Sequence, residues 1–423
     1  MDRPKYYSRD RSFVNKKLSE ELVKAYGTPL FVYDSKTVHK QAERVRQAFS
    51  WNPGFAMLFP VRIQNNPHML RVIHQAGCDV QCCNGVELRL AQMAGIPGED
   101  IVYYEMFPDY ESWSLALSCG ATIILDRGEQ LEDIRVNAYK GKGLGLRLNS
   151  YGYLDFQGIT QRSQISKMGM SKEELFATAK RAADRGYKNL GIYLTPGKEF
   201  SNPGALAQCT RKILEVASEL QREHGILLRW CHIGGDIYRC TKETPVDYLP
   251  KEASGIEVSF GKLVEKWPDL AGMALVMEVG QHIAIPAGVV IAKIQGIRNC
   301  GTTYAYTDFS CIHLPDAVKA GRHYHVSRPG KLLIEDRNAY RVAGCLPDAK
   351  DELVGNHVVH PLKRGDLVLI HDVGAYGRAS SSNFYGTLRA AEVLLDEGGY
   401  RLISRRETFD DYTNLLEGNE DQK

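Results

Sequence analysis

Eight short apolar runs alternate with longer amphipathic stretches between residues 55 and 280, and this pattern constrains the fold more than any other feature of the chain. An unalternating apolar run is typical of a strand buried on both faces, as in a parallel sheet. Eight strand–helix units over about 225 residues match a (β/α)8 TIM-type barrel in number and length. A doubly wound open sheet is the alternative, although it does not favour the number eight. The runs are 55–61, 78–83, 101–105, 122–126, 143–149, 190–195, 227–233 and 274–280.

A different pattern begins after residue 283. Its segments alternate in polarity or are rich in β-branched residues, with Gly and Pro between them, and this predicts a mostly antiparallel β-sandwich or β-barrel domain. We therefore expect an α/β protein with a segment over 1–30 that packs on the β domain, a (β/α)8 barrel over 31–283 and a C-terminal β domain over 284–423. The segments are 283–297, 302–309, 323–330, 338–344, 365–377 and 399–407.

The charge balance gives no global reason to expect an anionic partner. Lys and Arg number 53 against 51 Asp and Glu, a formal net charge of +2, so neither nucleic acid nor an anionic membrane is expected. No apolar run approaches the roughly 18 residues of a transmembrane helix, and the N-terminus lacks the apolar core of a signal peptide. The 10 cysteines form no CxxC pair, which argues against a zinc ribbon. We expect a reduced, cytoplasmic protein.

Polar residues follow several of the predicted strands, at the ends where a barrel carries its active site. Loop residues are often polar simply because they face solvent. Any one of these residues can therefore be an ordinary surface residue and not part of a site. The charges of Arg62 and Lys198 against those of Asp236 and Glu278 suit a zwitterionic small ligand. The strand-end residues are Arg62, Asn84, Arg147, Asn149, Thr195, Lys198, His232, Gly234, Gly235, Asp236, Glu278 and Gln281.

Six ordered motifs resemble those of the type III pyridoxal-phosphate-dependent decarboxylases, the diaminopimelate and ornithine decarboxylase family with the alanine racemase-like fold. The resemblance extends from about residue 25 to residue 400. It implies the barrel, the β domain, an amino-acid-type substrate and a head-to-tail homodimer with pockets at the interface. The motifs are YGTPLFVYD (26–34), GCDVQCCNGVELRLAQMAG (77–95), SKMGM (166–170), HIGGD (232–236), EVGQHIAIPAG (278–288) and GDLVLIHDVGAYGRASSSNFYG (365–386).

The resemblance also implies a pyridoxal phosphate site, but most residues that hold the cofactor in the family differ here. The lysine that forms the Schiff base aligns with Arg62, and an arginine stays protonated and cannot act as that amine nucleophile. The histidine that stacks on the cofactor ring aligns with Thr195, and a phosphate-contacting serine aligns with Lys198. The third glycine of the phosphate loop aligns with Asp236. Two further positions, an aspartate and an arginine in the family, align with Gln81 and Gln281.

Other family positions are retained. Glu278 matches the partner of the pyridine nitrogen, and Tyr376 matches the tyrosine of the family's GAY motif. Gly234 and Gly235 keep two glycines of the phosphate loop. Cys345 matches the cysteine that the family contributes across the dimer interface. With Thr195, these residues define a degenerate pyridoxal phosphate pocket or a substrate pocket.

These substitutions predict an enzyme whose site is rearranged and does not use lysine-bound pyridoxal phosphate. Arg62 would clamp a carboxylate or phosphate, and Lys198 would supply a second cation. Asp236 or Glu278 would bind an amine or act as a general base, and Cys345 would act as an acid or nucleophile. One alternative is a non-catalytic member that binds a metabolite or partner protein. The other is a pyridoxal-phosphate decarboxylase with atypical anchoring, for example through Lys198.

A metal site is a weaker alternative. His232, Asp236 and His282 contain the ligand types that zinc prefers, and they follow neighbouring predicted strands. Single histidines in loops are ordinarily hydrogen-bonding residues, and the spacing is common. We therefore expect no metal.

Overall fold

The computed structural model describes residues 13–134, 139, 141–149, 166–194, 204–235, 249–314, 324–331, 339–358 and 361–416. The chain divides into two compact units. Unit 1 contains the described residues up to Val38 and from Ile283 onward, and unit 2 contains those from His39 to His282. The expected start of the barrel at residue 31 therefore differs from this division, because β1 (Leu30–Asp34) belongs to the sheet of unit 1.

Unit 2 is a closed barrel of eight parallel strands, in which each strand pairs with the next and β9 pairs with β2. All eight predicted runs contain a barrel strand, so the predicted fold class is confirmed and the open-sheet alternative is excluded. The strands are β2 (Ala56–Pro60), β3 (Cys78–Cys82), β4 (Ile101–Tyr103), β5 (Thr122–Leu125), β6 (Leu144–Arg147), β7 (Leu190–Tyr193), β8 (Trp230–Gly235) and β9 (Ala274–Glu278).

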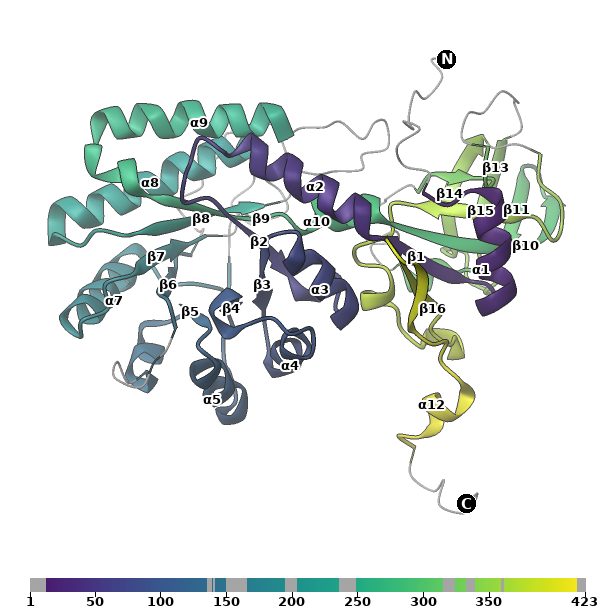
Figure 1. The fold of residues 1–423 in the computed structure, drawn as a ribbon, viewed down its shortest axis with the longest axis horizontal. Helices are drawn as coiled ribbons and strands as arrows, with labels where there is room; N and C mark the ends of the chain where they lie inside the picture. The colour runs from purple at the N-terminus through teal and green to yellow at the C-terminus, as the bar shows by residue number, and fades with distance from the viewer. Residues whose placement is uncertain are drawn as a thin grey trace. The chain divides into compact units, whose positions relative to one another are not determined.

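Helices surround these strands, as Figure 1 shows. Several begin at a polar cap just after a strand. Asn84 follows β3, and its side chain accepts a hydrogen bond from the backbone N–H of Glu87 in the first turn of α4. This hydrogen bond caps the start of the helix. Asn84, a strand-end candidate in the sequence, is therefore a helix cap. The helices of the barrel are α2 (Ser35–Ala48), which runs into it from unit 1, α3 (Pro67–Gln75), α4 (Gly85–Met93), α5 (Tyr110–Cys119), α7 (Lys172–Asp184), α8 (Ala205–His224) and α9 (Leu249–Lys266).

Unit 1 is built on a nine-stranded sheet, seven strands of which follow the order β14-β13-β11-β10-β1-β16-β17. Of the other two, β15 pairs with β10, and β12 pairs with β15. Six of its eight described pairings are antiparallel, which confirms the predicted character of this part of the chain. Besides β1, its strands are β10 (Gly288–Asn299), β11 (Thr303–Thr307), β12 (Val326–Ser327), β13 (Ala339–Ala343), β14 (Glu352–Val358), β15 (Leu367–His371), β16 (Ala391–Asp396) and β17 (Gly399–Ser404).

The core of unit 1 also includes the first described helix, α1 (Lys16–Tyr26). Its Leu22 is fully buried in one hydrophobic cluster with residues of β1, β10, β15 and β16, among them Val32, Ile291, Leu369 and Val393. Burying an aliphatic side chain in this way stabilises a fold by about 1.5–3 kcal/mol. In the described part of the chain, no helix is both long enough and apolar enough to cross a bilayer.

Candidate functional site

Each strand of the barrel brings one polar or aromatic residue to its carboxyl end or just beyond it. We call this set the mouth ring. Because parallel strands end at the same rim of a barrel, these side chains gather in one place. The mouth ring contains Arg62, Gln81, Tyr104, Asp126, Arg147, Tyr193, His232 and Glu278, which follow the order β2 to β9.

An ion pair between Arg62 and Glu278 joins the first and last strands of the barrel. Arg62 Nη2 lies 3.1 Å from Glu278 Oε2, and Arg62 Nη1 donates to Gln81 Oε1 at 3.2 Å. The guanidinium side chain is 42% exposed, whereas the carboxylate side chain is 12% exposed. Arg62 therefore holds a largely buried carboxylate while its own side chain still reaches solvent.

Tyr193 connects three other members of the mouth ring. Its hydroxyl donates to Glu278 Oε1 at 2.8 Å and accepts from Gln81 Nε2 at 2.6 Å. Its ring stacks on His232, with centroids 4.0 Å apart and planes inclined by 16°. Both carboxylate oxygens of Glu278 thus have a donor, one from Tyr193 and one from Arg62.

His232 is fully buried beside Glu278. Its Nδ1 lies 3.0 Å from the carbonyl oxygen of Leu194 and also accepts from the backbone N–H of Gly234 at 3.3 Å. Its Nε2 lies 3.7 Å from Glu278 Oε1 and has no hydrogen-bond partner in the described structure. Burial lowers the pKa of His232, although the carboxylate of Glu278 acts in the opposite direction. Burial therefore favours the neutral ring, whose Nε2 faces the Glu278 carboxylate.

The pKa of Glu278 lies below its ordinary value. Burial raises this pKa, but the charge of Arg62, the neighbouring His232 and the hydrogen bonds from Tyr193 and Arg62 together lower it by more. Glu278 is therefore a carboxylate at neutral pH. It is an acceptor for a cation or a hydrogen-bond donor, and its proton affinity is too low for it to serve as an acid there.

The opposite side of the mouth ring contains Arg147, Tyr104 and Asp126. The Arg147 guanidinium carbon lies 4.4 Å from the centre of the Tyr104 ring and 5.2 Å from that of Tyr193. Tyr104 donates its hydroxyl to Asp126 Oδ1 at 2.6 Å, and the backbone N–H of Gly169 donates to the same oxygen at 2.9 Å. Asp126 is therefore committed to Tyr104 and to the loop before α7.

The two glycines of β8 allow this strand to end against Glu278. Gly235 is opposite Glu278 in the strand register, and a Cβ on Gly235 would lie 2.4 Å from the Glu278 carbonyl oxygen. Gly234 has a φ of 91°, a conformation that favours glycine. The local sequence HIGG is thus required by backbone packing beside Glu278, whatever ligand the site takes.

The structure places the predicted site residues in three groups. Arg62, Glu278, Gly234 and Gly235 lie together at the barrel mouth, joined by His232 and Arg147 from the strand-end set. The predicted residues Thr195, Lys198 and Asp236 lie outside the described residues. The third group, Tyr376 and Cys345, belongs to unit 1.

Within unit 1, Cys345 and Tyr376 have distinct surroundings. The Cys345 thiol is exposed and donates to the Thr307 carbonyl oxygen at 3.2 Å. Desolvation raises the pKa of Cys345, and Asp351 and Asp308 raise it further. This environment favours a protonated thiol over a thiolate nucleophile. Tyr376 has a φ of 59°, rare for a side chain with a Cβ, and its carbonyl accepts from the Ser380 hydroxyl.

Sequence reasoning did not select three members of the mouth ring as site residues: Tyr104, Asp126 and Tyr193. Tyr104 and Asp126 come directly after β4 and β5 in the structure, but they lie inside the predicted runs 101–105 and 122–126, which extend past the true strand ends. Tyr193 is the last residue of β7, and its side chain is identified only by its contacts with Gln81 and Glu278. A tyrosine inside an apolar run otherwise indicates a core residue.

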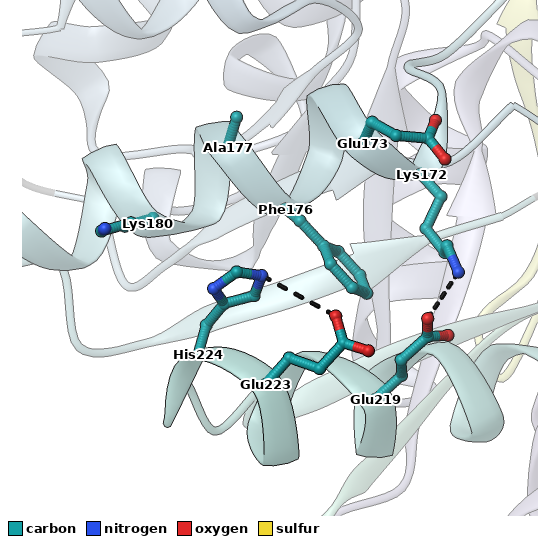
Figure 2. A pocket seen from close by; sticks show the side chains of 8 residues that line it. All are labelled: Lys172, Glu173, Phe176, Ala177, Lys180, Glu219, Glu223 and His224. Atoms are coloured by element: carbon teal, nitrogen blue, oxygen red, sulfur yellow. Dashed lines mark hydrogen bonds and ion pairs between the residues drawn. The ribbon is translucent and has the colours of Figure 1, made fainter.

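A separate hollow of about 530 Å³ lies on the outer helices of the barrel (Figure 2). It is formed by α7 and α8, and none of its lining residues belongs to the mouth ring. An ion pair between Lys172 and Glu219 closes one side of it, and Phe176 packs edge-on against His224. Its lining residues are Lys172, Glu173, Phe176, Ala177, Lys180, Glu219, Glu223 and His224. Among the described residues, no three His, Cys, Asp or Glu side chains group as metal ligands would.

Comparison with known proteins identifies a family over most of the barrel. The family model "Pyridoxal-dependent decarboxylase, pyridoxal binding domain" matches residues 35–284. Protein TabA of Pseudomonas amygdali pv. tabaci is 28% identical over 409 residues, which cover 95% of this chain and 94% of TabA. The diaminopimelate decarboxylase of Thermoplasma acidophilum is 24% identical over 397 residues, covering 93% and 94% of the two chains.

A solved structure has the same fold along nearly the whole chain. The crystal structure of diaminopimelate decarboxylase from M. jannaschii, in complex with L-lysine, superposes with a TM-score of 0.79. The aligned residues cover 93% of each chain and are 20% identical. At this identity the match supports the fold and leaves the reaction to be argued from the site.

Proposed function

The chain belongs to the pyridoxal-dependent decarboxylase family, and from this premise we propose that it is a divergent member that binds an amino-acid-type small molecule at the barrel mouth and acts on it without a lysine-bound pyridoxal phosphate. The observation that supports this most is the ion pair of Arg62 with Glu278, 3.1 Å long. It places a guanidinium beside the carboxylate that the family uses for the pyridine nitrogen.

The described residues do not fit a lysine-linked pyridoxal phosphate. The resemblance aligns the family's Schiff-base lysine with Arg62, and a guanidinium cannot form that bond. Both oxygens of Glu278 already accept hydrogen bonds, from Tyr193 and from Arg62, so a pyridine nitrogen would have to compete with them. The mouth ring contains two guanidiniums and no lysine. We therefore assign no step of the reaction to the cofactor.

The ligand class follows from the charges of the mouth ring. A carboxylate at Glu278 and guanidiniums at Arg62 and Arg147 provide one acceptor and two cationic groups within one rim. An amino acid carries the complementary ammonium and carboxylate. The L-lysine bound to the M. jannaschii relative has the same chemistry. We include Thr195, Lys198 and Asp236 in the proposed pocket on the strength of the resemblance alone.

Non-catalytic binding is the second candidate function. It is favoured by the same two hydrogen bonds on Glu278, since a carboxylate with a lowered pKa and two donors is a poor general base. Incubating the protein with single amino acids and assaying released CO2 and the corresponding amine separates the two candidates. Binding without either product would support the non-catalytic reading.

The test of the proposal is the substitution Arg62→Lys. This change supplies an amine at the aligned position, so we expect added pyridoxal phosphate to produce a visible aldimine band and a borohydride-reducible adduct at position 62. Arg71→Lys is the matched control, because Arg71 lies on α3 and donates to the Ala94 carbonyl oxygen at 3.0 Å, outside the mouth ring. Absence of an adduct in Arg62→Lys would contradict the alignment of Arg62 with the family's lysine.

We also propose that the protein forms the head-to-tail homodimer of its family, with Cys345 and Tyr376 acting as site residues there. The donor character of the Cys345 thiol supports a role as an acid rather than as a nucleophile. Sedimentation equilibrium measures the assembly directly. A monomer at micromolar concentration would rule out a cross-subunit role for Cys345.

A further inference from the structure

Arg147 differs from the other guanidinium of the mouth ring because no described residue serves as its anionic partner. It is only 5% exposed, yet its guanidinium makes no hydrogen bond or ion pair with any residue that the structure describes. Arg62, by contrast, is paired with Glu278. A buried charge without a counter-ion costs several kcal/mol, so such groups are ordinarily paired.

The contacts that Arg147 does make hold it in place without neutralising it. Its guanidinium lies over the faces of Tyr104 and Tyr193, and the electron-rich faces of these rings attract the cation. The backbone around it is also fixed. The Arg147 carbonyl accepts from the Met170 N–H at 2.8 Å, and the next residue, Leu148, donates to the Tyr193 carbonyl at 2.9 Å. The cation is therefore positioned in advance of any ligand.

The two carboxylates of the mouth ring, Asp126 and Glu278, do not serve as the counter-ion. Asp126 accepts from the Tyr104 hydroxyl and from the Gly169 N–H, and it forms no ion pair with Arg147. Glu278 is engaged by Arg62 and Tyr193. The fully enclosed polar atoms that lack a hydrogen-bond partner include His232 Nε2 but none of the Arg147 nitrogens, so these nitrogens are not fully enclosed.

We propose that Arg147 is the oxyanion-binding residue of the site and takes the carboxylate or phosphate group of the ligand. A planar guanidinium that is held by two aromatic rings presents its edge N–H groups as a fork, which matches two oxygens of such a group. The inference rests on the proposed function for the location of the ligand. It assigns the binding of the ligand's anionic group to Arg147 instead of Arg62, because Glu278 already balances the charge of Arg62.

Thermal unfolding of the dialysed protein, titrated with sodium acetate and with sodium phosphate at constant ionic strength in chloride, tests this. We expect the wild type to be stabilised by at least one of the two anions. In Arg147→Met the apparent Kd for that anion should rise at least tenfold. Arg71→Met removes the same charge from the exposed face of α3 and should keep the wild-type response. A stronger effect of acetate identifies a carboxylate ligand, and a stronger effect of phosphate identifies a phosphate ester.

Three results would overturn the inference. They are a wild type that responds no more to acetate or phosphate than to chloride, an unchanged response in Arg147→Met, and an equal loss in Arg71→Met. Arg147→Lys covers the case in which Arg147→Met does not fold. It keeps the charge without the fork, so we expect a weaker response than that of the wild type, and an undiminished one would also contradict the proposal. Because neither anion requires pyridoxal phosphate, this test can fail or succeed independently of the proposed function.

Discussion

At the scale of single residues, the carboxylate of Glu278 is the centre of the site. It joins Arg62 from β2, Tyr193 from β7 and the fully buried His232 from β8. A largely buried carboxylate is stable only when donors and a cation compensate its desolvation. The barrel supplies both, so this one side chain links strands that are distant in sequence.

Replacing this carboxylate gives a pH-dependent prediction. The pKa of Glu278 in the folded protein lies below its ordinary value, so its stabilising effect is present above the ordinary pKa and is lost as the pH falls through the folded value. We expect Glu278→Gln to reduce the free energy of unfolding by about 1–2 kcal/mol at pH 7, since Arg62 is partly exposed. The difference from wild type should shrink steadily below about pH 4.5.

Urea unfolding at pH 7 and at several lower pH values measures this difference. Glu223→Gln is the control, because Glu223 is an exposed residue of α8 whose ion-pair contact, with His224, is 4.0 Å long. Its effect should stay within about 0.5 kcal/mol. A constant difference between Glu278→Gln and the wild type at every pH would show that the carboxylate has no charge-dependent role in stability.

The sequence permitted a partial prediction of the site at this scale. Arg62 was predicted because it directly follows an apolar run, and Glu278 because it lies near the end of the last run and matches a family position. Tyr193 was not, because a tyrosine at the end of a run has the same pattern as a core residue. The sequence also did not predict that Glu278 accepts hydrogen bonds from Arg62 and Tyr193. These contacts depend on side-chain positions, which cannot be read from the spacing of residues in the sequence.

At the scale of elements, the end of β8 shows how backbone packing sets the geometry of the mouth. β8 and β9 change register between His232 and Gly235, and this brings Gly235 directly opposite Glu278. There is no room for a side chain at this position, since a Cβ would lie 2.7 Å from the Cβ of Glu278. The strand end is therefore specified by glycine.

Two glycine substitutions test this reading in opposite directions. Gly235→Ala forces a methyl group against β9, and we expect a loss of about 1–3 kcal/mol in stability, as for other overpacked sites. Gly261→Ala lies on α9 with nothing within 4 Å of the new Cβ, and should stabilise the protein by about 0.5–1 kcal/mol through helix propensity. Thermal denaturation of both variants measures the contrast, and a Gly235→Ala variant as stable as wild type would contradict the packing argument.

The sequence predicted the strands of the barrel better than those of unit 1. The eight barrel strands were found because burial on both faces leaves an apolar run in each. β1 has the same signature, with all five residues buried, and the expected barrel therefore began at residue 31. Its true neighbours are β10 and β16, more than 250 residues away in sequence, and local patterns do not report such pairings. β14 and β16 were not among the predicted segments.

At the scale of the whole molecule, the chain keeps the architecture of its family, and we propose that its mouth ring carries other chemistry. The relatives and this chain match along more than nine-tenths of their lengths, and the barrel closes with all eight strands. Fold is set by hundreds of distributed packing contacts, whereas a cofactor site depends on a few residues, so the two can diverge separately. Our central claim concerns this divergence.

The most direct test of that claim is borohydride reduction of the wild-type protein after incubation with pyridoxal phosphate, followed by peptide mass mapping. We predict no visible aldimine band and no reduced pyridoxyl adduct on any lysine at stoichiometric level. The Arg62→Lys variant, treated in parallel, should acquire one adduct per chain at position 62. A stoichiometric adduct on a wild-type lysine, such as Lys198, would contradict the claim and establish a lysine-bound cofactor with a different anchor.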